Sequence, residues 1–254
     1  MKFGVLLAAV AMLAPQQVRA NGRPATSEPI TFNASVRVEV DAAGMPVKVE
    51  APAEFPDAMR QFIQKRVSSW QYQPAMQDGE PVPAVTYVRV GACAVPAEGG
   101  YRLGLDFKGN GPALVNDRGW FLPPPAYPRS PMMAGVEGEF LVNYSIRADG
   151  STHVDEIKAQ TVSNRAYARD FQKTLTAWAE GFHYRPEQVN GIPVATQMSI
   201  PVSFSLSNNP RQDYAKEEKA RALASSECVA AAQSAGLTPI AQNSPIKVTP
   251  PPAG

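Results

Sequence analysis

The sequence is poor in the residues on which metal, nucleic-acid and nucleophilic chemistry depends. Its 254 residues include two histidines and two cysteines, and the net charge is +1. A nearly neutral chain has no net positive electrostatic potential to attract a polyanion, which argues against nucleic acid as a partner. Metal sites need several ligands at fixed spacing, and neither His153 nor His183 has such neighbours. Both are predicted to be surface or turn residues.

No group of residues in the sequence suggests a catalytic site. The motif Gly-x-Ser-x-Gly of serine hydrolases is absent. Gly104, Gly109 and Gly111 do not open a helix after a strand, as a phosphate-binding loop would. Asp155 and Glu156 are neighbours on a predicted strand and point to opposite faces, so they cannot act as a pair. We therefore predict a protein without catalytic residues, metal or cofactor.

Apolar runs long enough to cross a membrane are also missing. The run Phe3–Ala14 has twelve residues, whereas a spanning helix needs about 20. Lys2 precedes it, and the small residues Val18 and Ala20 follow at the positions that a signal peptidase reads. The pattern predicts a signal peptide over residues 1–20, cleaved after Ala20, and export of the mature chain. The alternative is an uncleaved anchor in the inner membrane.

A sixteen-residue stretch of the chain recurs in similar form. Residues 70–85 read WQYQPAMQDGEPVPAV, and the stretch that begins 112 residues later, at Phe182, reads FHYRPEQVNGIPVATQ. Both contain an aromatic residue, Tyr-x-Pro and Gly-x-Pro-Val in the same order. The recurrence indicates an internal repeat.

The elements around the two stretches follow one plan. Apolar residues alternate with polar ones over Val36–Val40 and Phe140–Ile146, which is typical of half-buried strands. A turn with Gly44 or Gly150 and a second strand follow, then a helical pattern, then a closing strand. We predict an α+β fold of two tandem β-β-α-β units, each a small antiparallel sheet with one helix on its face, plus a C-terminal helix.

These patterns predict the following organisation. The chain has a signal peptide at 1–20, a first unit at 30–95, a linker at 96–125, a second unit at 126–207, a C-terminal helix at 211–235 and a disordered tail at 236–254.

The two cysteines could join the end of the chain to the first unit. Strand alternation turns Cys93 away from the face that the helix covers, and Cys228 lies on the predicted C-terminal helix. If that helix packs on the open face of the first sheet, a Cys93–Cys228 disulfide can form in an oxidising compartment. The alternative is two unpaired, buried thiols.

Several motifs of the second unit occur in an order that resembles the C-terminal domain of the TonB family. They are Tyr127-Pro128, Gly135 and Gly138, Asp149-Gly150, Trp178 to Phe182, Tyr184-x-Pro186, Gly191-x-Pro193-Val194 and Ile200–Phe204. The first unit shares a glycine turn, Tyr-x-Pro and Gly-x-Pro-Val with it, but has no Tyr-Pro at its start. The first unit therefore resembles a diverged relative.

The resemblance implies binding in the periplasm. Domains of this family pair with an extended segment of an outer-membrane receptor, and an exposed edge strand donates and accepts the main-chain hydrogen bonds. The resemblance places that edge on the closing strand, with Gln197, Ser199, Pro201, Ser203 and Phe204 as the site. Pro201 suits an edge because it lacks a donor, although it could equally serve to protect the edge from aggregation.

The resemblance leaves three functions to weigh. An energy-transducing TonB keeps a membrane helix and a long proline-rich spacer, and no such spacer is present here. We therefore expect an exported, non-catalytic module that binds a segment of an outer-membrane receptor or of another periplasmic protein. The alternative is an anchored transducer. An enzyme with a site between the units is the third, but no convergent polar residues support it. Open edges would also permit a domain-swapped homodimer.

Overall fold

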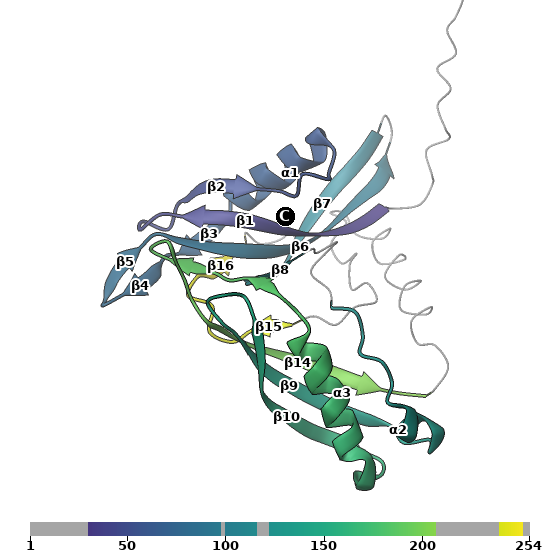
Figure 1. Cartoon of the computed structure of the whole chain (residues 1–254). Coiled ribbons are helices and arrows are strands. Elements are labelled where there is room, and N and C mark those ends of the chain that lie inside the picture. The colour runs from purple at the N-terminus through teal and green to yellow at the C-terminus, as the bar shows by residue number, and fades with distance from the viewer. Residues whose placement is uncertain (1–29, 98–99, 116–121, 207–238, 251–254) are drawn as a thin grey trace, which may run out of the picture.

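The computed structural model describes residues 30–97, 100–115, 122–206 and 239–250 (Figure 1). The fold is mixed α+β, and all strand pairs of these residues are antiparallel. The first half, residues 30–115, contains β1 (Ile30–Val40), β2 (Pro46–Glu50), α1 (Asp57–Ser68), β3 (Gln71–Gln73), β4 (Ala75–Gln77), β5 (Glu80–Val82), β6 (Ala84–Ala97), β7 (Gly100–Gly111) and β8 (Ala113–Leu114).

The remaining elements belong to two further parts of the chain. The second half, residues 122–206, contains α2 (Arg129–Met133), β9 (Gly138–Ile146), β10 (Thr152–Val162), the 3₁₀ helix η1 (Arg165–Tyr167), α3 (Ala168–Glu180), β11 (Tyr184–Arg185), β12 (Gln188–Val189), β13 (Ile192–Pro193) and β14 (Thr196–Phe204). The C-terminal segment, residues 239–250, contains β15 (Ile240–Ala241) and β16 (Lys247–Thr249).

In the first half, α1 packs on one face of a sheet in which β1 lies between β2 and β6. Val36, Val38 and Val40 of β1 are at most 1% exposed, because alternate side chains of a strand share one face. Ile63 and Val67 of α1 complete this core from the other side. The helix begins at Asp57, directly after Pro56, whose fixed φ suits the entry to a helix.

The second half has its own sheet and its own core. β9 lies between β10 and β14, and the full length of β14 pairs with β9. Phe171 and Leu175 of α3 are fully buried against this sheet. Asn164 accepts a hydrogen bond from the N–H of Ala166 and so caps η1, which leads into α3.

Two pairs of turns have matching backbone geometry at the offsets seen in the sequence. In the β1–β2 turn the N–H of Asp41 bonds to the carbonyl of Met45, and in the β9–β10 turn Arg147 bonds to Ser151 in the same way. The β4–β5 and β12–β13 turns each have two residues with positive φ, Asp78-Gly79 and Asn190-Gly191. That geometry is the type I′ hairpin turn.

The first pair of turns explains why Tyr-x-Pro recurs after each helix. A Cβ on Gly44 would lie 2.4 Å from the carbonyl oxygen of Tyr72, and a Cβ on Gly150 would lie 2.1 Å from that of Tyr184. Each hairpin turn therefore presses its glycine against the backbone of the tyrosine in its own half. In each half, the glycine turn and the Tyr-x-Pro motif therefore pack against each other.

The region predicted as a linker, residues 96–125, contains regular structure that belongs to both halves. β7 pairs with β6 over Tyr87–Ala97, and β8 pairs with β11 of the second half. Leu122 is 1% exposed within the second core. Pro123 accepts a hydrogen bond from the indole N–H of Trp178 at 2.8 Å, so the proline stretch packs on α3.

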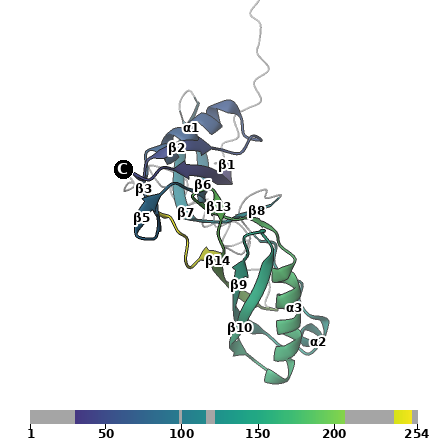
Figure 2. The ribbon, with the colours of Figure 1, turned by 60° about the vertical axis from the view of Figure 1, so that its left-hand side comes forward.

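The tail predicted to be disordered, residues 236–254, is instead ordered over residues 239–250. β15 pairs with β14 of the second half, and β16 pairs with β3 of the first half. Ile246 is 1% exposed in the core of the first half, which supplies the burial needed to order this segment. Figure 2 shows the C-terminal segment in yellow, running from the upper half to the lower one.

Backbone pairing also joins the two halves directly. Gln188 and Val189 of β12 pair with Val85 and Ala84 of β6, so a hairpin of the second half extends the sheet of the first. The predicted signal peptide and C-terminal helix lie outside the described residues. Within the described ranges, no helix is long and apolar enough to cross a membrane.

Candidate binding edge

The outer edge of β14 is the candidate site, and its alternation sets what each residue presents. Met198, Ile200 and Val202 point into the core, whereas Gln197, Pro201 and Ser203 are exposed. Both main-chain groups of Gln197 face away from β9: its N–H bonds to Asn243 Oδ1 and its carbonyl accepts from the N–H of Gln242. By the two-residue period, the main-chain groups of Ser199, Pro201 and Ser203 face the same way.

Pro201 therefore lies where its missing N–H removes no bond to β9. It remains an acceptor on the outer side through its carbonyl. Of the five predicted site residues, Gln197, Ser199, Pro201 and Ser203 share this side of the strand. Phe204 does not: its side chain is 4% exposed and packs against Phe171, with ring centroids 4.8 Å apart.

The chain itself occupies the first part of this edge. β15 pairs Ala241 with Met198 and Ile240 with Ser199. In the part of the chain that the structure describes, no strand pairs with the outer side of residues 200–204. The edge is thus divided into a covered part at Gln197–Ser199 and an uncovered part at Ile200–Phe204.

A buried carboxyl group lies behind the covered part of the edge. Glu187 precedes β12 and its side chain is 0% exposed. Its Oε1 accepts hydrogen bonds from Thr86 Oγ1 at 2.6 Å and from Ser244 Oγ at 2.7 Å. Thr86 belongs to the first half and Ser244 to the C-terminal segment. Glu187 therefore joins all three parts of the chain.

The surroundings of Glu187 determine its ionisation. Burial raises the pKa of the Glu187 carboxyl, while the hydroxyl donors and the nearby Arg89 act in the opposite direction. Asn110 extends the network, because its Nδ2 donates to Ser244 Oγ and to the carbonyl of Ile246, each at 2.9 Å. Neither Glu187 nor this network was predicted from the sequence, where an isolated glutamate carries no signal of burial.

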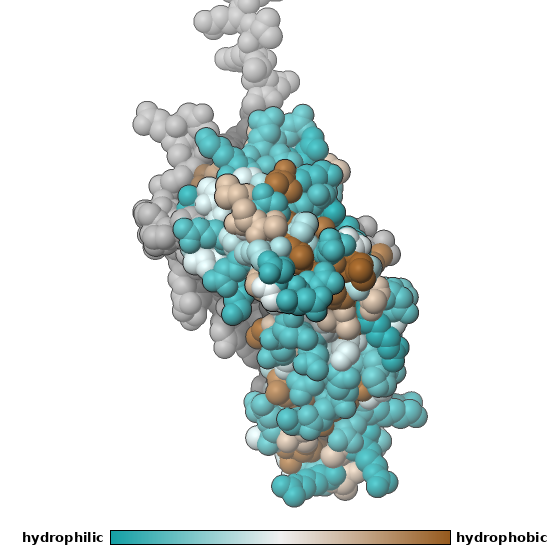
Figure 3. Space-filling view, turned by 90° about the vertical axis from the view of Figure 1, so that its left-hand side faces the viewer, coloured by the Kyte–Doolittle hydropathy of each residue, from teal (hydrophilic) through white to brown (hydrophobic). Residues whose placement is uncertain are grey.

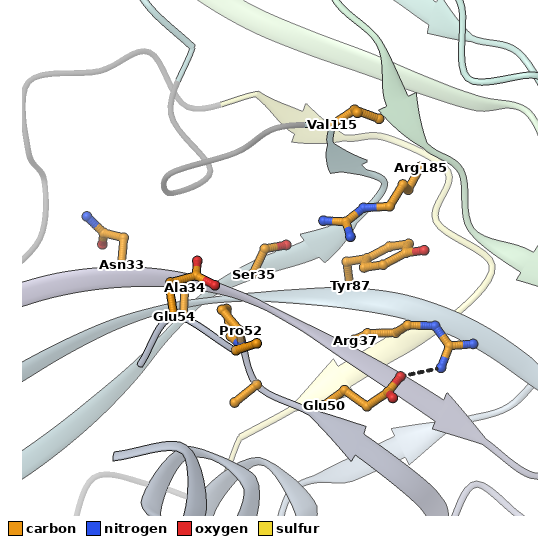
Figure 4. Close-up of a pocket in the computed structure, with 12 residues that line it drawn as sticks. Asn33, Ala34, Ser35, Arg37, Glu50, Pro52, Glu54, Tyr87, Val115 and Arg185 are labelled. Carbon is orange, nitrogen blue, oxygen red and sulfur yellow. Dashed lines mark hydrogen bonds and ion pairs between the residues drawn. The ribbon is translucent and has the colours of Figure 1, made fainter. Parts of the chain in front are cut away.

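A groove of about 490 Å³ lies beside β1 in the first half (Figure 4). Two of its charged side chains form an ion pair: Arg37 Nη1 lies 2.8 Å from Glu50 Oε2. The guanidinium carbon of Arg185, from the second half, lies 5.4 Å from the ring centroid of Tyr87. This cation–π contact adds to the junction of the halves.

The described residues contain no cluster of three or more metal-ligating side chains. His153 Nδ1 lies 3.3 Å from Glu180 Oε1 at the surface, and His183 is exposed. Cys93 is buried outside the core cluster that faces α1. Its predicted partner Cys228 lies outside the described residues, so the disulfide stays a prediction.

The second half is an α+β unit with a helix-backed antiparallel sheet, and among the described residues no strand pairs with the outer side of residues 200–204. Residues 123–206 match the family model described as Gram-negative bacterial TonB protein C-terminal. This segment is a TonB C-terminal domain, as the order of its motifs predicts. The family is periplasmic-facing and generally non-catalytic, and its domains interact with outer-membrane receptors or other proteins. No curated protein matches the chain.

Proposed function

We propose that the chain is an exported periplasmic binding protein that pairs a segment of an outer-membrane receptor, or of another periplasmic protein, with the outer edge of β14. The uncovered stretch Ile200–Phe204 carries this proposal. It offers the carbonyl of Pro201 and both main-chain groups of Ser203 to an incoming strand. Family membership of residues 123–206 supports a protein as the partner.

We further propose that the first half is a diverged copy of the same unit. The matching turns and the shared contact between glycine and tyrosine support this origin. The copies differ at their edges. Among the described strands, none pairs with the outer side of residues 200–204 of β14, whereas β6 is paired on that side with β7 and β12. Under this proposal the first copy supports the structure and the second copy binds.

Removing one outward donor tests the edge. Ser203→Pro deletes the N–H that faces the partner and keeps the pairing of β14 with β9, while Ser203→Ala keeps the N–H and serves as the matched control. We expect Ser203→Pro to weaken capture of outer-membrane proteins from a solubilised membrane fraction by about tenfold or more, with Ser203→Ala equal to wild type. Equal capture by wild type, Ser203→Pro and Ser203→Ala would show that β14 is not the binding edge.

A further inference from the structure

β15 occupies the edge of β14 in the way that a bound peptide would. It runs antiparallel to β14, and the N–H of Gln242 donates to the carbonyl of Gln197 at 2.8 Å. Asn243 extends the contact with its side chain, whose Oδ1 accepts the N–H of Gln197 at 2.7 Å. The first outward donor and the first outward acceptor of the edge are therefore satisfied within the chain.

The segment that makes these contacts is unevenly attached. Residues 240–243, here called the arm, form two register pairs with β14, and Ile240 is 54% exposed. Residues 246–249, here called the anchor, form three register pairs with β3, and Ile246 is buried in the core of the first half. Ser244 lies between them and donates to the buried Glu187. The arm is held less firmly than the anchor, because Ala241 is the one arm residue that packs against the second core, next to the buried Pro239, whereas the anchor contains the fully buried Ile246. We therefore expect the arm to detach while the anchor stays in place.

The first half limits the space around the arm. A Cβ on Gly111, the last residue of β7, would lie 2.8 Å from the Cβ of Ala241. The arm therefore lies between the edge of β14 and the end of β7 (Figure 1). An incoming strand cannot continue from Ser203 to Gln197 while the arm is there, since one edge accepts one strand.

From these contacts we infer that the arm is a built-in competitor: it closes the Gln197–Ser199 part of the edge, and a protein segment must displace it to pair with the whole of β14. This inference rests on the proposed function of the edge. The anchor keeps the displaced arm close by, which gives the arm a high effective concentration and lets it close again when the partner leaves. The apparent affinity of a partner is reduced by the fraction of molecules in which the arm is closed.

The test opens the arm without touching β14. Gln242→Pro removes the donor to Gln197, and Gln242→Ala keeps it and is the matched control. Asn243→Ala removes the acceptor for the N–H of Gln197 without changing the backbone of the arm, in case proline disturbs folding. Amide hydrogen exchange of the full chain reports opening. We expect exchange at Gln197 and Ser199 to accelerate about tenfold in Gln242→Pro and two- to tenfold in Asn243→Ala, with Tyr72 beside the anchor unchanged.

Binding of a defined probe completes the test. A synthetic peptide of residues 239–244 is titrated into each isotope-labelled full chain, and the amide signal of Gln197 is followed by NMR. The open variants should bind the peptide about tenfold more tightly than wild type and Gln242→Ala. Equal affinity in all proteins, or exchange that accelerates at Tyr72 as much as at Gln197, would overturn the inference. If the open variants bind the peptide but the Ser203 variants all capture outer-membrane proteins equally, the competitor stands and the proposed function fails.

Discussion

At the scale of single residues, the glycines of the hairpin turns show how closely the backbone is packed. Gly150 has φ +84°, and its position against the Tyr184 carbonyl leaves no room for a side chain. Positive φ alone is a modest cost for a residue with a Cβ, but contact with a backbone atom cannot be relieved by a rotamer change.

Gly150→Ala should therefore lower the free energy of unfolding by about 2–4 kcal/mol. Gly191→Ala is the matched control, because Gly191 has φ +77° and no atom within 4 Å of the added Cβ. That control should cost about 1–2 kcal/mol from φ alone. Urea unfolding of the full chain, followed by tryptophan fluorescence, measures both. Equal losses would contradict the packing explanation.

At the scale of elements, local patterns predicted the strands and helices that have clear periodicity. The alternation of Val36–Val40 and that of Phe140–Ile146 both follow from neighbours a few residues apart. The edge of β14 was expected from the family resemblance, and strand alternation then gives which of its residues face outward.

The elements that the sequence did not predict depend on contacts distant in the chain. β16 pairs Val248 with Tyr72, and β12 pairs Gln188 with Val85. Because the paired residues lie far apart in the chain, no local sequence pattern predicts either pairing. The alternation Ile246-x-Val248 between prolines was the available signal, but a three-residue strand falls below what periodicity can distinguish from a coil. The order of the tail and the occupied part of the edge were missed for this reason.

The anchor strand should contribute to stability out of proportion to its length. Ile246→Ala removes a side chain that is 1% exposed and leaves a cavity in the core of the first half, which should cost about 2–4 kcal/mol. Ile240→Ala, at a side chain 54% exposed on the arm, should change stability by less than about 0.5 kcal/mol. Thermal unfolding of both variants gives the comparison, and similar losses would show that the arm and the anchor are held equally firmly.

At the scale of the whole molecule, exposed apolar side chains concentrate where several hairpins end. Met45, Val47, Met76 and Ile192 are each at least 60% exposed. Val40 pairs with Pro46 and with Ala84, and Ala84 pairs with Val189, so the hairpins of both halves meet at one end of the sheet. Figure 3 shows apolar residues on this side set among hydrophilic ones.

The Glu187 network links the two halves and the C-terminal segment, so its ionisation should affect the whole chain. Burial raises the pKa of Glu187 above its ordinary value of 4.5. Between 4.5 and the raised pKa the folded state holds a proton that the unfolded state has lost, so stability falls as pH rises through this window. Glu187→Gln has no such proton and should lose this component of the pH dependence.

Urea unfolding of wild type and Glu187→Gln across this pH range tests the linkage. The free energy of unfolding of wild type, relative to that of the variant, should be highest at the acid end and should decline as pH rises. Parallel curves would mean that the carboxyl has the same pKa in both states, and a difference that grows with pH would mean that its pKa is lowered on folding.

The burial of Ile246 also has a consequence for the order in which the protein is completed. The core of the first half includes a residue near the end of the chain, and its sheet includes a hairpin from residues 188–193. A ribosome that has released the first hundred residues has therefore not yet supplied everything that this half needs. The second half can form around its own core as soon as β14 is made, so the part of the protein synthesised first is the part that matures last.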